Sequence, residues 1–209
     1  ISSDHNTYFV GAASGGLWRT KNNGISWKPI FDDQDVSSVS ALAVSQKDPN
    51  IVWAGTGETF LIRPAHAIGD GIYKSTDGGD TWTNMGLEKT ARIGRIVIHP
   101  TNPNIVYVAA LGHAHGPQKE RGIYRTTDGG KSWEHVLFIN ENTGGIDIAI
   151  DLNNPDFLLA SMWEIHINTW GLNSGGDAGG VFISRDGGDS WERQDKNGLP
   201  GGKGKPVGK

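Results

Sequence analysis

The sequence contains no cysteine, only two methionines and no long apolar run. Without cysteine the chain has no disulfide framework, no thiolate zinc site and no thiol nucleophile. No stretch approaches the roughly 18 consecutive apolar residues of a membrane-spanning helix, so no membrane span is expected. The formal net charge is −4, which argues against a basic surface for nucleic acid. These absences leave a globular protein of some other class.

No segment shows the 3.6-residue period of an amphipathic helix. Short runs of β-branched and aromatic residues are instead bounded by glycine, proline, asparagine and aspartate, which is typical of β-strands and turns. Glycine accounts for 31 of the 209 residues, about twice its average usage. These glycines have no period of three, so the chain is not collagen-like. The composition predicts an all-β fold.

Four octets share the pattern Ser/Thr-x-Asp-x-Gly-x-x-Trp, with asparagine replacing aspartate in the first copy. They span residues 20–27, 75–82, 126–133 and 184–191. Their tryptophans are 55, 51 and 58 residues apart. A pattern that recurs at a period of about 50 residues indicates a repeated supersecondary unit.

The segments around the octets also repeat. A glycine and a short apolar pair precede each octet, and three units contain a turn with proline between two apolar runs. The expected first and second strands are 39–44 and 51–54, 93–98 and 105–109, and 146–150 and 157–160. Each unit therefore consists of strand, turn, strand, variable loop, strand, tight turn and strand. This is a four-stranded propeller blade, and the sequence predicts an incomplete β-propeller of about 3.5 blades.

The repeat also predicts where each blade begins and ends. The expected boundaries are 1–35 for the second half of a blade, 36–90, 91–142 and 143–197 for complete blades, and 198–209 for a linker or the truncated start of a further blade. Closed propellers have about 4–8 blades. We therefore expect further blades from the same full-length chain or from another chain.

Each part of the octet serves a hairpin. Asp-Gly-Gly supplies the positive φ angles of a tight turn, the Asp and Ser/Thr side chains bond nearby backbone groups, and the tryptophan covers the turn. The predicted structural residues are Asn22, Trp27, Asp77, Trp82, Asp128, Trp133, Asp186 and Trp191. A calcium site at Asp77/Asp80 or Asp186/Asp189 is the weaker alternative, because Lys131 interrupts the acidic pattern in the third copy. No metal or cofactor is expected.

The octet resembles the Asp-box, also called the BNR repeat. Asp-boxes occur in sialidases, xyloglucanases, sortilin-type receptors and many exported bacterial proteins, and the resemblance covers about residues 10–195. The residues in and around the octets are most similar to the last group, the bacterial sortilin-like propellers. These proteins are often labelled glycosyl hydrolases on the repeat alone. The resemblance implies a secreted, periplasmic or cell-surface bacterial protein. It also implies Asp-boxes at the blade periphery, so the motif identifies the fold and not the activity.

Two departures from the enzyme families bear on activity. Residues 11–19 resemble xyloglucanases, and the position that matches one of their catalytic carboxylates is Ala13. The Arg-Ile-Pro signature of sialidases has only a poor counterpart in residues 62–64. An alanine can act neither as an acid nor as a base, so these departures argue against both kinds of chemistry within the chain.

The variable loops between the second and third strands carry the candidate site. They span 58–70, 112–121 and 163–177, and the candidate ligand-binding residues are Arg63, His66, His113, His115, Arg121, Trp163, Glu164, His166 and Trp170. Aromatic rings with His, Glu and Arg suit sugar or peptide binding, and loops on rigid scaffolds commonly carry function. Neutral imidazoles with carboxylates could also bind a transition metal, or the histidines could simply bond backbone carbonyls.

The leading functional prediction is a non-catalytic exported scaffold or recognition module that binds a protein, peptide or glycan through these loops. The alternative is a carbohydrate-active enzyme, either a glycoside hydrolase or a sialidase-like propeller, with catalytic acids partly outside the segment. Glu58, Glu120 and Glu164 are the loop acids that such an enzyme could use. The sequence itself identifies no catalytic residue.

Overall fold

The computed structural model describes residues 5–59, 67–168 and 170–195. These residues form antiparallel sheets that follow one another along the chain, and each sheet is one blade. The first blade contains β1 (Tyr8–Gly11), β2 (Leu17–Thr20) and β3 (Lys28–Pro29). The second contains β4 (Val39–Val44), β5 (Val52–Thr56), β6 (Ile72–Ser75) and β7 (Thr83–Asn84). The third contains β8 (Ile93–Ile98), β9 (Val106–Ala110), β10 (Gly122–Thr126) and β11 (Glu134–Leu137), and a short 3-10 helix, η1 (Glu88–Thr90), precedes it. The fourth contains β12 (Thr143–Ile150), β13 (Leu158–Asn168), β14 (Gly171–Ser174), β15 (Gly180–Ser184) and β16 (Glu192–Gln194).

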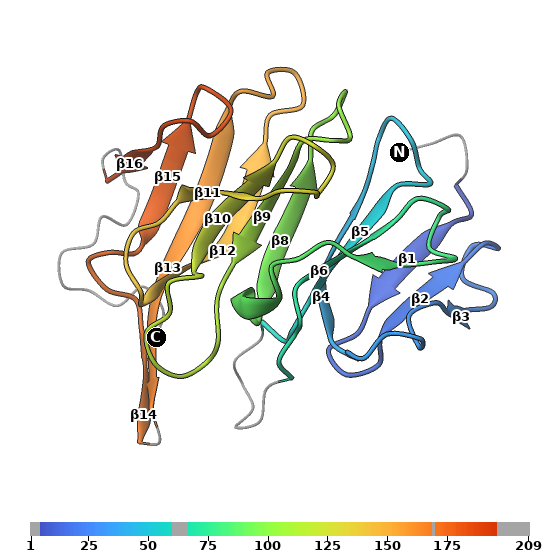
Figure 1. Ribbon diagram of the computed structural model, residues 1–209, viewed down its shortest axis with the longest axis horizontal. Helices are drawn as coiled ribbons and strands as arrows, with labels where there is room; N and C mark the ends of the chain where they lie inside the picture. Colours follow the sequence, from blue (N-terminus) through green and yellow to red (C-terminus); the bar gives the residue numbers. More distant parts are fainter. Residues whose placement is uncertain (1–4, 60–66, 169, 196–209) are drawn as a thin grey trace.

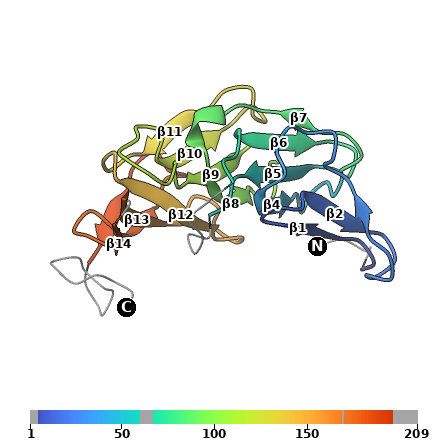
Figure 2. The same ribbon diagram turned by 90° about the horizontal axis from the view of Figure 1, so that it is seen from below.

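The blades stand side by side in an arc (Figure 2). The inner strands β4, β8 and β12 contact one another in sequence, and the remaining strands of each blade follow outward in chain order. This arrangement confirms the prediction of an incomplete β-propeller. Within the described residues no helix is long and apolar enough to cross a membrane.

The hydrophobic core lies between neighbouring blades. Trp53 of β5 packs with Ile93 and Ile96 of β8, and Tyr107 of β9 packs with Leu158 of β13. Every residue of β5 and of β9 is buried. A strand covered on both faces needs apolar residues at consecutive positions, which explains the continuous apolar runs in the sequence.

The octets form hairpins that dock on the preceding blade. The glycine carbonyl in each of three hairpins accepts a hydrogen bond from a basic side chain on β2, β6 or β10 of the preceding blade. The donor and acceptor pairs are Arg19 to Gly78, Lys74 to Gly129 and Arg125 to Gly187, at 2.5, 3.0 and 2.8 Å. We call these three contacts the interblade bonds. They tie the outer part of each blade to the next one.

The fourth blade differs from the prediction in one element. Residues 163–177 were expected to form a loop, but β13 continues to Asn168 and pairs with β14, with Ile165 opposite Ser174 and Ile167 opposite Leu172. Polar and apolar residues alternate from Glu164 to Asn168, which is the pattern of a strand. We call residues 163–168 together with 170–174 the projecting hairpin, because it extends beyond the ends of the other strands (Figure 1).

The face of the first blade that is turned away from the second blade is open. Tyr8 and Val10 are both 47% exposed, whereas the residues at the same positions in the second blade, Val52 and Ala54, are fully buried. Val52 and Ala54 are covered because their side chains face the first blade, where Ala54 joins a cluster with Leu17. The exposed pair therefore marks a surface of the kind that another blade covers elsewhere in the molecule.

Candidate functional site

The candidate loops and the octets lie at opposite ends of the blades. The octet hairpins are bonded to the turns between the first and second strands, as shown by Gly78 N to Asn50 O at 2.9 Å and Gly129 N to Asn104 O at 3.0 Å. In antiparallel blades the loops between the second and third strands must then emerge at the other end. We call this end the loop face, and Figure 1 shows the projecting hairpin extending from it.

The projecting hairpin presents an aromatic ring to solvent. Trp170 lies at its tip and is 93% exposed. At the base of the hairpin, the indole nitrogen of Trp163 donates to Ser174 Oγ at 3.1 Å. The two tryptophans therefore differ in role, since Trp163 ties the two strands together and Trp170 is available for contact with a ligand.

A carboxylate and an imidazole are held side by side at the base of the same hairpin. Glu164 Oε1 lies 3.2 Å from His166 Nε2, and the backbone N–H of Ala178 donates to Glu164 Oε2 at 2.9 Å. The two side chains lie on one face of β13 because they are two residues apart. Both remain accessible to solvent, so the pair can bind a hydroxyl group or exchange a proton with a ligand.

The second-to-third loop of the third blade is held by internal hydrogen bonds. His113 N donates to Gln118 Oε1 at 2.7 Å, and the buried Arg121 donates to the carbonyls of His113, Gly116 and Asn142. Burial, followed by the charge of Arg121, lowers the pKa of His113, which favours the neutral imidazole. His115 is exposed. Arg121 therefore supports the loop from beneath rather than facing solvent.

A second buried arginine supports this loop, and the sequence analysis missed it. Arg92 is 1% exposed, and its Nε donates to Gly112 O at 2.6 Å. Burial, with the charge of Arg121 as the smaller cause, lowers the pKa of Arg92 to about 10. No local pattern marked this residue, because it only precedes an ordinary apolar strand.

The remaining candidates are distributed over three blades. Glu58 is buried at the start of the second blade's loop, whereas Glu120 is half-buried. A cavity of about 620 Å³ opens beside His113 and is lined by Glu88, Lys89, Gln118, Lys119, Glu120 and Glu141, among others. Arg63 and His66 lie outside the described residues. Among the residues that the structure describes, no group of three or more His, Asp or Glu side chains is placed to hold a metal ion.

The acids of the octets are occupied by partners within the fold. Asp77 accepts hydrogen bonds from the backbone N–H and the hydroxyl of Thr81, at 2.9 and 2.6 Å. Asp80 forms an ion pair with Arg19, and Asp189 forms one with Arg125. These contacts give each of these carboxylates a partner within the fold.

The octet carboxylates predict an acid-sensitive stability. Hydrogen bonds from Ser190 lower the pKa of Asp186 to about 2, and those from Thr81 and Ser132 likewise lower the pKa of Asp77 and Asp128. A carboxyl group whose pKa is lower in the folded state than in the unfolded state, where it is about 3.9, stabilises the fold at pH values above 3.9. This stabilisation is lost as the pH falls toward 2. We expect the melting temperature, measured by circular dichroism, to fall between pH 4 and pH 2.

The first octet shows that asparagine can replace the aspartate of the other three octets. There Asn22 makes the equivalent contacts, because its Oδ1 accepts from Ser26 N and its Nδ2 donates to Ser26 Oγ, both at 2.9 Å. The triple variant Asp77→Asn, Asp128→Asn, Asp186→Asn should fold and lose much of this pH dependence, whereas the exposed-site control Asp33→Asn should keep it. An unchanged pH profile in the triple variant would contradict the assignment.

The chain is similar to several xyloglucanases. It is 30% identical over 145 residues to a xyloglucanase of Paenibacillus sp, a match that covers 62% of this chain and 13% of that protein. It is 21% identical over 204 residues to the oligoxyloglucan-reducing end-specific xyloglucanase of Emericella nidulans, covering 91% of this chain and 22% of that protein. The chain thus spans less than a quarter of the length of these curated relatives.

Solved structures share the fold. The crystal structure of an ancestral GH74 enzyme superimposes with a TM-score of 0.68 at 21% identity, covering 92% of this chain and 24% of that one. The leading prediction of a non-catalytic scaffold or recognition module is corrected by these comparisons, because the relatives are named as xyloglucanases. They favour the alternative, a carbohydrate-active enzyme. The prediction failed because every strong motif in the sequence is structural, and the departures at Ala13 and at residues 62–64 were taken as evidence against the enzyme families.

A family comparison covers the second half of the second blade and the third and fourth blades. The model of the Sortilin-Vps10 family, described as "Sortilin, neurotensin receptor 3", matches residues 70–198, which is more than half of the chain. This match agrees with the sortilin-like part of the resemblance inferred from the octets. The chain belongs to the Sortilin-Vps10 family.

Proposed function

We propose that the chain is part of a carbohydrate-active β-propeller of the glycoside hydrolase class, and that its loop face binds a polysaccharide. The observation that carries this proposal is the similarity to xyloglucanases, which extends over 62% and 91% of the chain in the two relatives named above. The catalytic acids would lie partly outside these 209 residues. Xyloglucan, the substrate named for the relatives, is the first substrate to test.

The proposal gives the two ends of the blades different roles. We assign the four octets to the Asp-box repeat, so they hold the blades together, and we assign binding to the loop face. Glu164 is the acid on that face that is best fixed in position, because Ala178 and His166 both hold its carboxylate. Glycoside hydrolysis needs a second carboxyl group at about 5–9.5 Å. Ala13 does not supply one, so the second acid is sought elsewhere in the full-length protein.

The direct test is to incubate the full-length protein with xyloglucan and with other plant and microbial polysaccharides, and to measure the reducing ends released. Release that is lost in a Glu164→Gln variant would support both the class and the residue. Release that survives this change would retain the class and remove Glu164 from the site. No release from any polysaccharide would contradict the proposed class.

Trp170 provides a binding test that does not require catalysis. An exposed aromatic ring offers a flat apolar face on which a sugar ring can stack, so Trp170→Ala should weaken binding of xyloglucan oligosaccharides about tenfold, or about 1.4 kcal/mol. Calorimetric titration would measure this loss. The melting temperature should not change, because a side chain that is 93% exposed contributes little to packing.

Trp27 supplies the matched control. It is an octet tryptophan that is 39% exposed, and it lies at the end opposite to the loop face. Trp27→Ala should leave oligosaccharide binding unchanged. Equal losses in the two variants, or no loss in Trp170→Ala, would remove the projecting hairpin from the proposed binding surface.

Location and assembly follow from the same proposal. A polysaccharide substrate lies outside the cell, so we place the full-length protein in the secreted, periplasmic or cell-surface class. We also propose that further blades, from the same chain or another, cover the open face at Tyr8 and Val10.

A further inference from the structure

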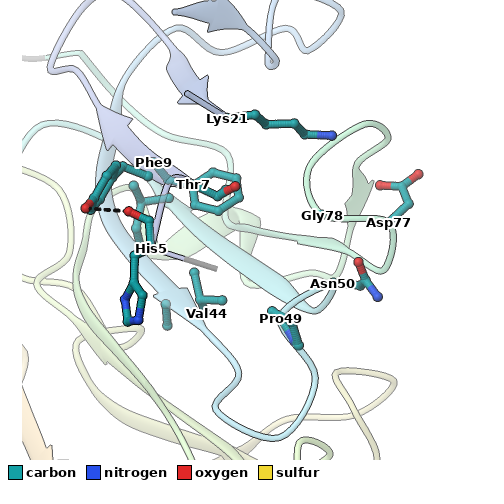
Figure 3. A pocket seen from close by; sticks show the side chains of 12 residues that line it. His5, Thr7, Phe9, Lys21, Val44, Pro49, Asn50, Asp77 and Gly78 are labelled. Atoms are coloured by element: carbon teal, nitrogen blue, oxygen red, sulfur yellow. Dashed lines mark hydrogen bonds between the residues drawn. The ribbon is translucent and has the colours of Figure 1, made fainter. Parts of the chain in front are cut away.

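A cavity of about 500 Å³ lies at the loop-face end of β11, the outer strand of the third blade. Its walls are the second-to-third loop of that blade and residues 138–142, which connect β11 to β12. Gln118 N donates to Glu141 O at 2.8 Å, so the two walls are bonded to each other. The lining residues are Lys119, His135, Phe138, Ile139, Asn140 and Glu141. A separate groove of about 780 Å³ lies at the end of the blades that carries the octets, where Asn50 and Asp77 border it (Figure 3).

The imidazole ring of His135 is fixed in position. Its Nε2 lies 3.0 Å from Arg121 O, and its ring stacks on Tyr124 with the two centroids 4.3 Å apart. A Cβ atom at Gly122 would lie 2.3 Å from Nε2, so only glycine allows the ring to approach this closely. Because a carbonyl oxygen can only accept, Nε2 must carry the proton and donate.

The same position holds a donor in two other blades. Asn84 of the second blade and Arg193 of the fourth lie opposite the residues that correspond to Tyr124. They donate in the same way to the carbonyls of Asp70 and Asp177. Histidine differs from asparagine and arginine because it has a second ring nitrogen that can accept. Burial lowers the pKa of His135, which favours the neutral ring and leaves Nδ1 as an acceptor.

The other lining groups suit a neutral ligand that is rich in hydroxyl groups. Phe138 is 45% exposed, and its ring lies edge-on to His135 with the centroids 5.4 Å apart. Lys119 and Glu141 carry opposite charges, so the lining of the cavity is formally neutral. An apolar ring surrounded by a few hydrogen-bonding groups is typical of a small-molecule site. A sugar ring presents the matching chemistry, with an apolar face and hydroxyl groups at its edge.

The wall of this cavity is bonded to the projecting hairpin. Asn142 O accepts hydrogen bonds from Arg121 Nη1 at 3.1 Å and from Ile165 N at 3.0 Å. Arg121 ends the loop that forms one wall, Asn142 ends the segment that forms the other, and Ile165 lies in the projecting hairpin. A ligand of several sugar units can therefore contact the cavity and the hairpin on the same face.

We propose that this cavity is a second sugar-binding subsite, in which a neutral sugar ring stacks on Phe138 and one of its hydroxyl groups donates to His135 Nδ1. Lys119 and Glu141 bond further hydroxyl groups of the same ring. The inference rests on the proposed function and adds to it, because it extends the polysaccharide-binding surface from the fourth blade to the third.

His135→Asn tests the acceptor while it keeps the structural bond. Asn84 shows that asparagine at this position can donate to the carbonyl before the third strand, so the variant should fold with an unchanged melting temperature. It should bind xyloglucan oligosaccharides about fivefold more weakly, the effect of losing one hydrogen bond. Calorimetric titration of the full-length protein would measure the affinity.

Phe138→Ala tests the stacking ring in the same assay. We expect binding to weaken about tenfold, the effect of losing one aromatic contact. The matched control is Leu152→Ala, which also removes an exposed apolar side chain, 55% exposed, but from the turn between β12 and β13 at the opposite end of the blades. This control should leave binding unchanged. If Phe138→Ala does not fold, His135→Asn decides.

The outcomes separate this subsite from the proposed function. If His135 only holds the backbone, His135→Asn will bind as tightly as the unmodified protein, and the proposal is overturned. Weaker binding in Trp170→Ala but not in His135→Asn or Phe138→Ala would likewise overturn the subsite and retain the proposed function. An equal loss in Leu152→Ala would also refute it. If no oligosaccharide binds, the subsite is overturned, and the release of reducing ends tests the proposed function separately.

Discussion

Replacing Gly130 with alanine is expected to lower the free energy of unfolding by about 3 kcal/mol, the sum of a backbone cost and an overpacking cost. Gly130 has a φ of +97°, which disfavours any residue with a Cβ atom. A Cβ at this position would also lie 2.6 Å from Trp53 Cη2 and 3.0 Å from Met85 Cε. The Trp53 ring is fully buried and cannot move aside. Urea unfolding would measure the loss.

Variants at two other glycines allow the backbone cost and the overpacking cost to be measured separately. Gly78 has a φ of +72°, but its nearest neighbour would be Asn50 Oδ1 at 3.7 Å, so Gly78→Ala should show only the backbone cost of about 1–2 kcal/mol. Gly171 has nothing within 4 Å, so Gly171→Ala should be nearly neutral. If Gly130→Ala cost no more than Gly78→Ala, the close docking of the third octet on Trp53 would be refuted.

Removing the interblade bond of Arg125 is expected to destabilise the fold by about 2–3 kcal/mol, the range for breaking a largely buried charged hydrogen-bond network. Arg125 Nη1 donates to Gly187 O and Asp189 Oδ1, and its Nη2 donates to Glu134 Oε2. Its side chain is only 14% exposed. Arg125→Met keeps the apolar stem and removes the charge, and thermal unfolding would measure the effect.

Arg185 is the matched control for this prediction. It is the second residue of the fourth octet and pairs with a glutamate, Glu192, but both side chains are largely exposed. Exposed pairs contribute about 0–1 kcal/mol, so Arg185→Met should cause little change. Similar losses in the two variants would show that the third and fourth blades are not joined through Gly187.

Much of the fold follows from the octets. Their spacing located the four blades, and strands expected at 39–44 and 93–98 are β4 and β8 with the same bounds. The extension of β13 was missed, because aromatic and charged residues at 163–168 suggested a ligand-binding loop. The alternation of Glu164, Ile165, His166 and Ile167 was nevertheless a usable strand signal.

The candidate site was predicted less well, for physical reasons. The sequence shows which side chains a loop carries, but their exposure depends on packing between blades. Arg121 and Trp170 were both predicted to bind a ligand, yet the structure buries the first beneath its loop and places the second in solvent. Arg92 supports the same loop from a position just before β8, 20 residues before Gly112 in the chain, a relation that no local pattern encodes.

The position of the octets at the end opposite the loop face has a consequence for how this protein can change. The contacts that set blade order use residues such as Arg125 and Gly187, and none of them requires a particular sequence in residues 163–174. A projecting hairpin of another length could therefore be grafted onto the fourth blade without altering the joints between blades. The joints between blades are thus independent of the projecting hairpin, whose length and sequence can vary while the fold is kept.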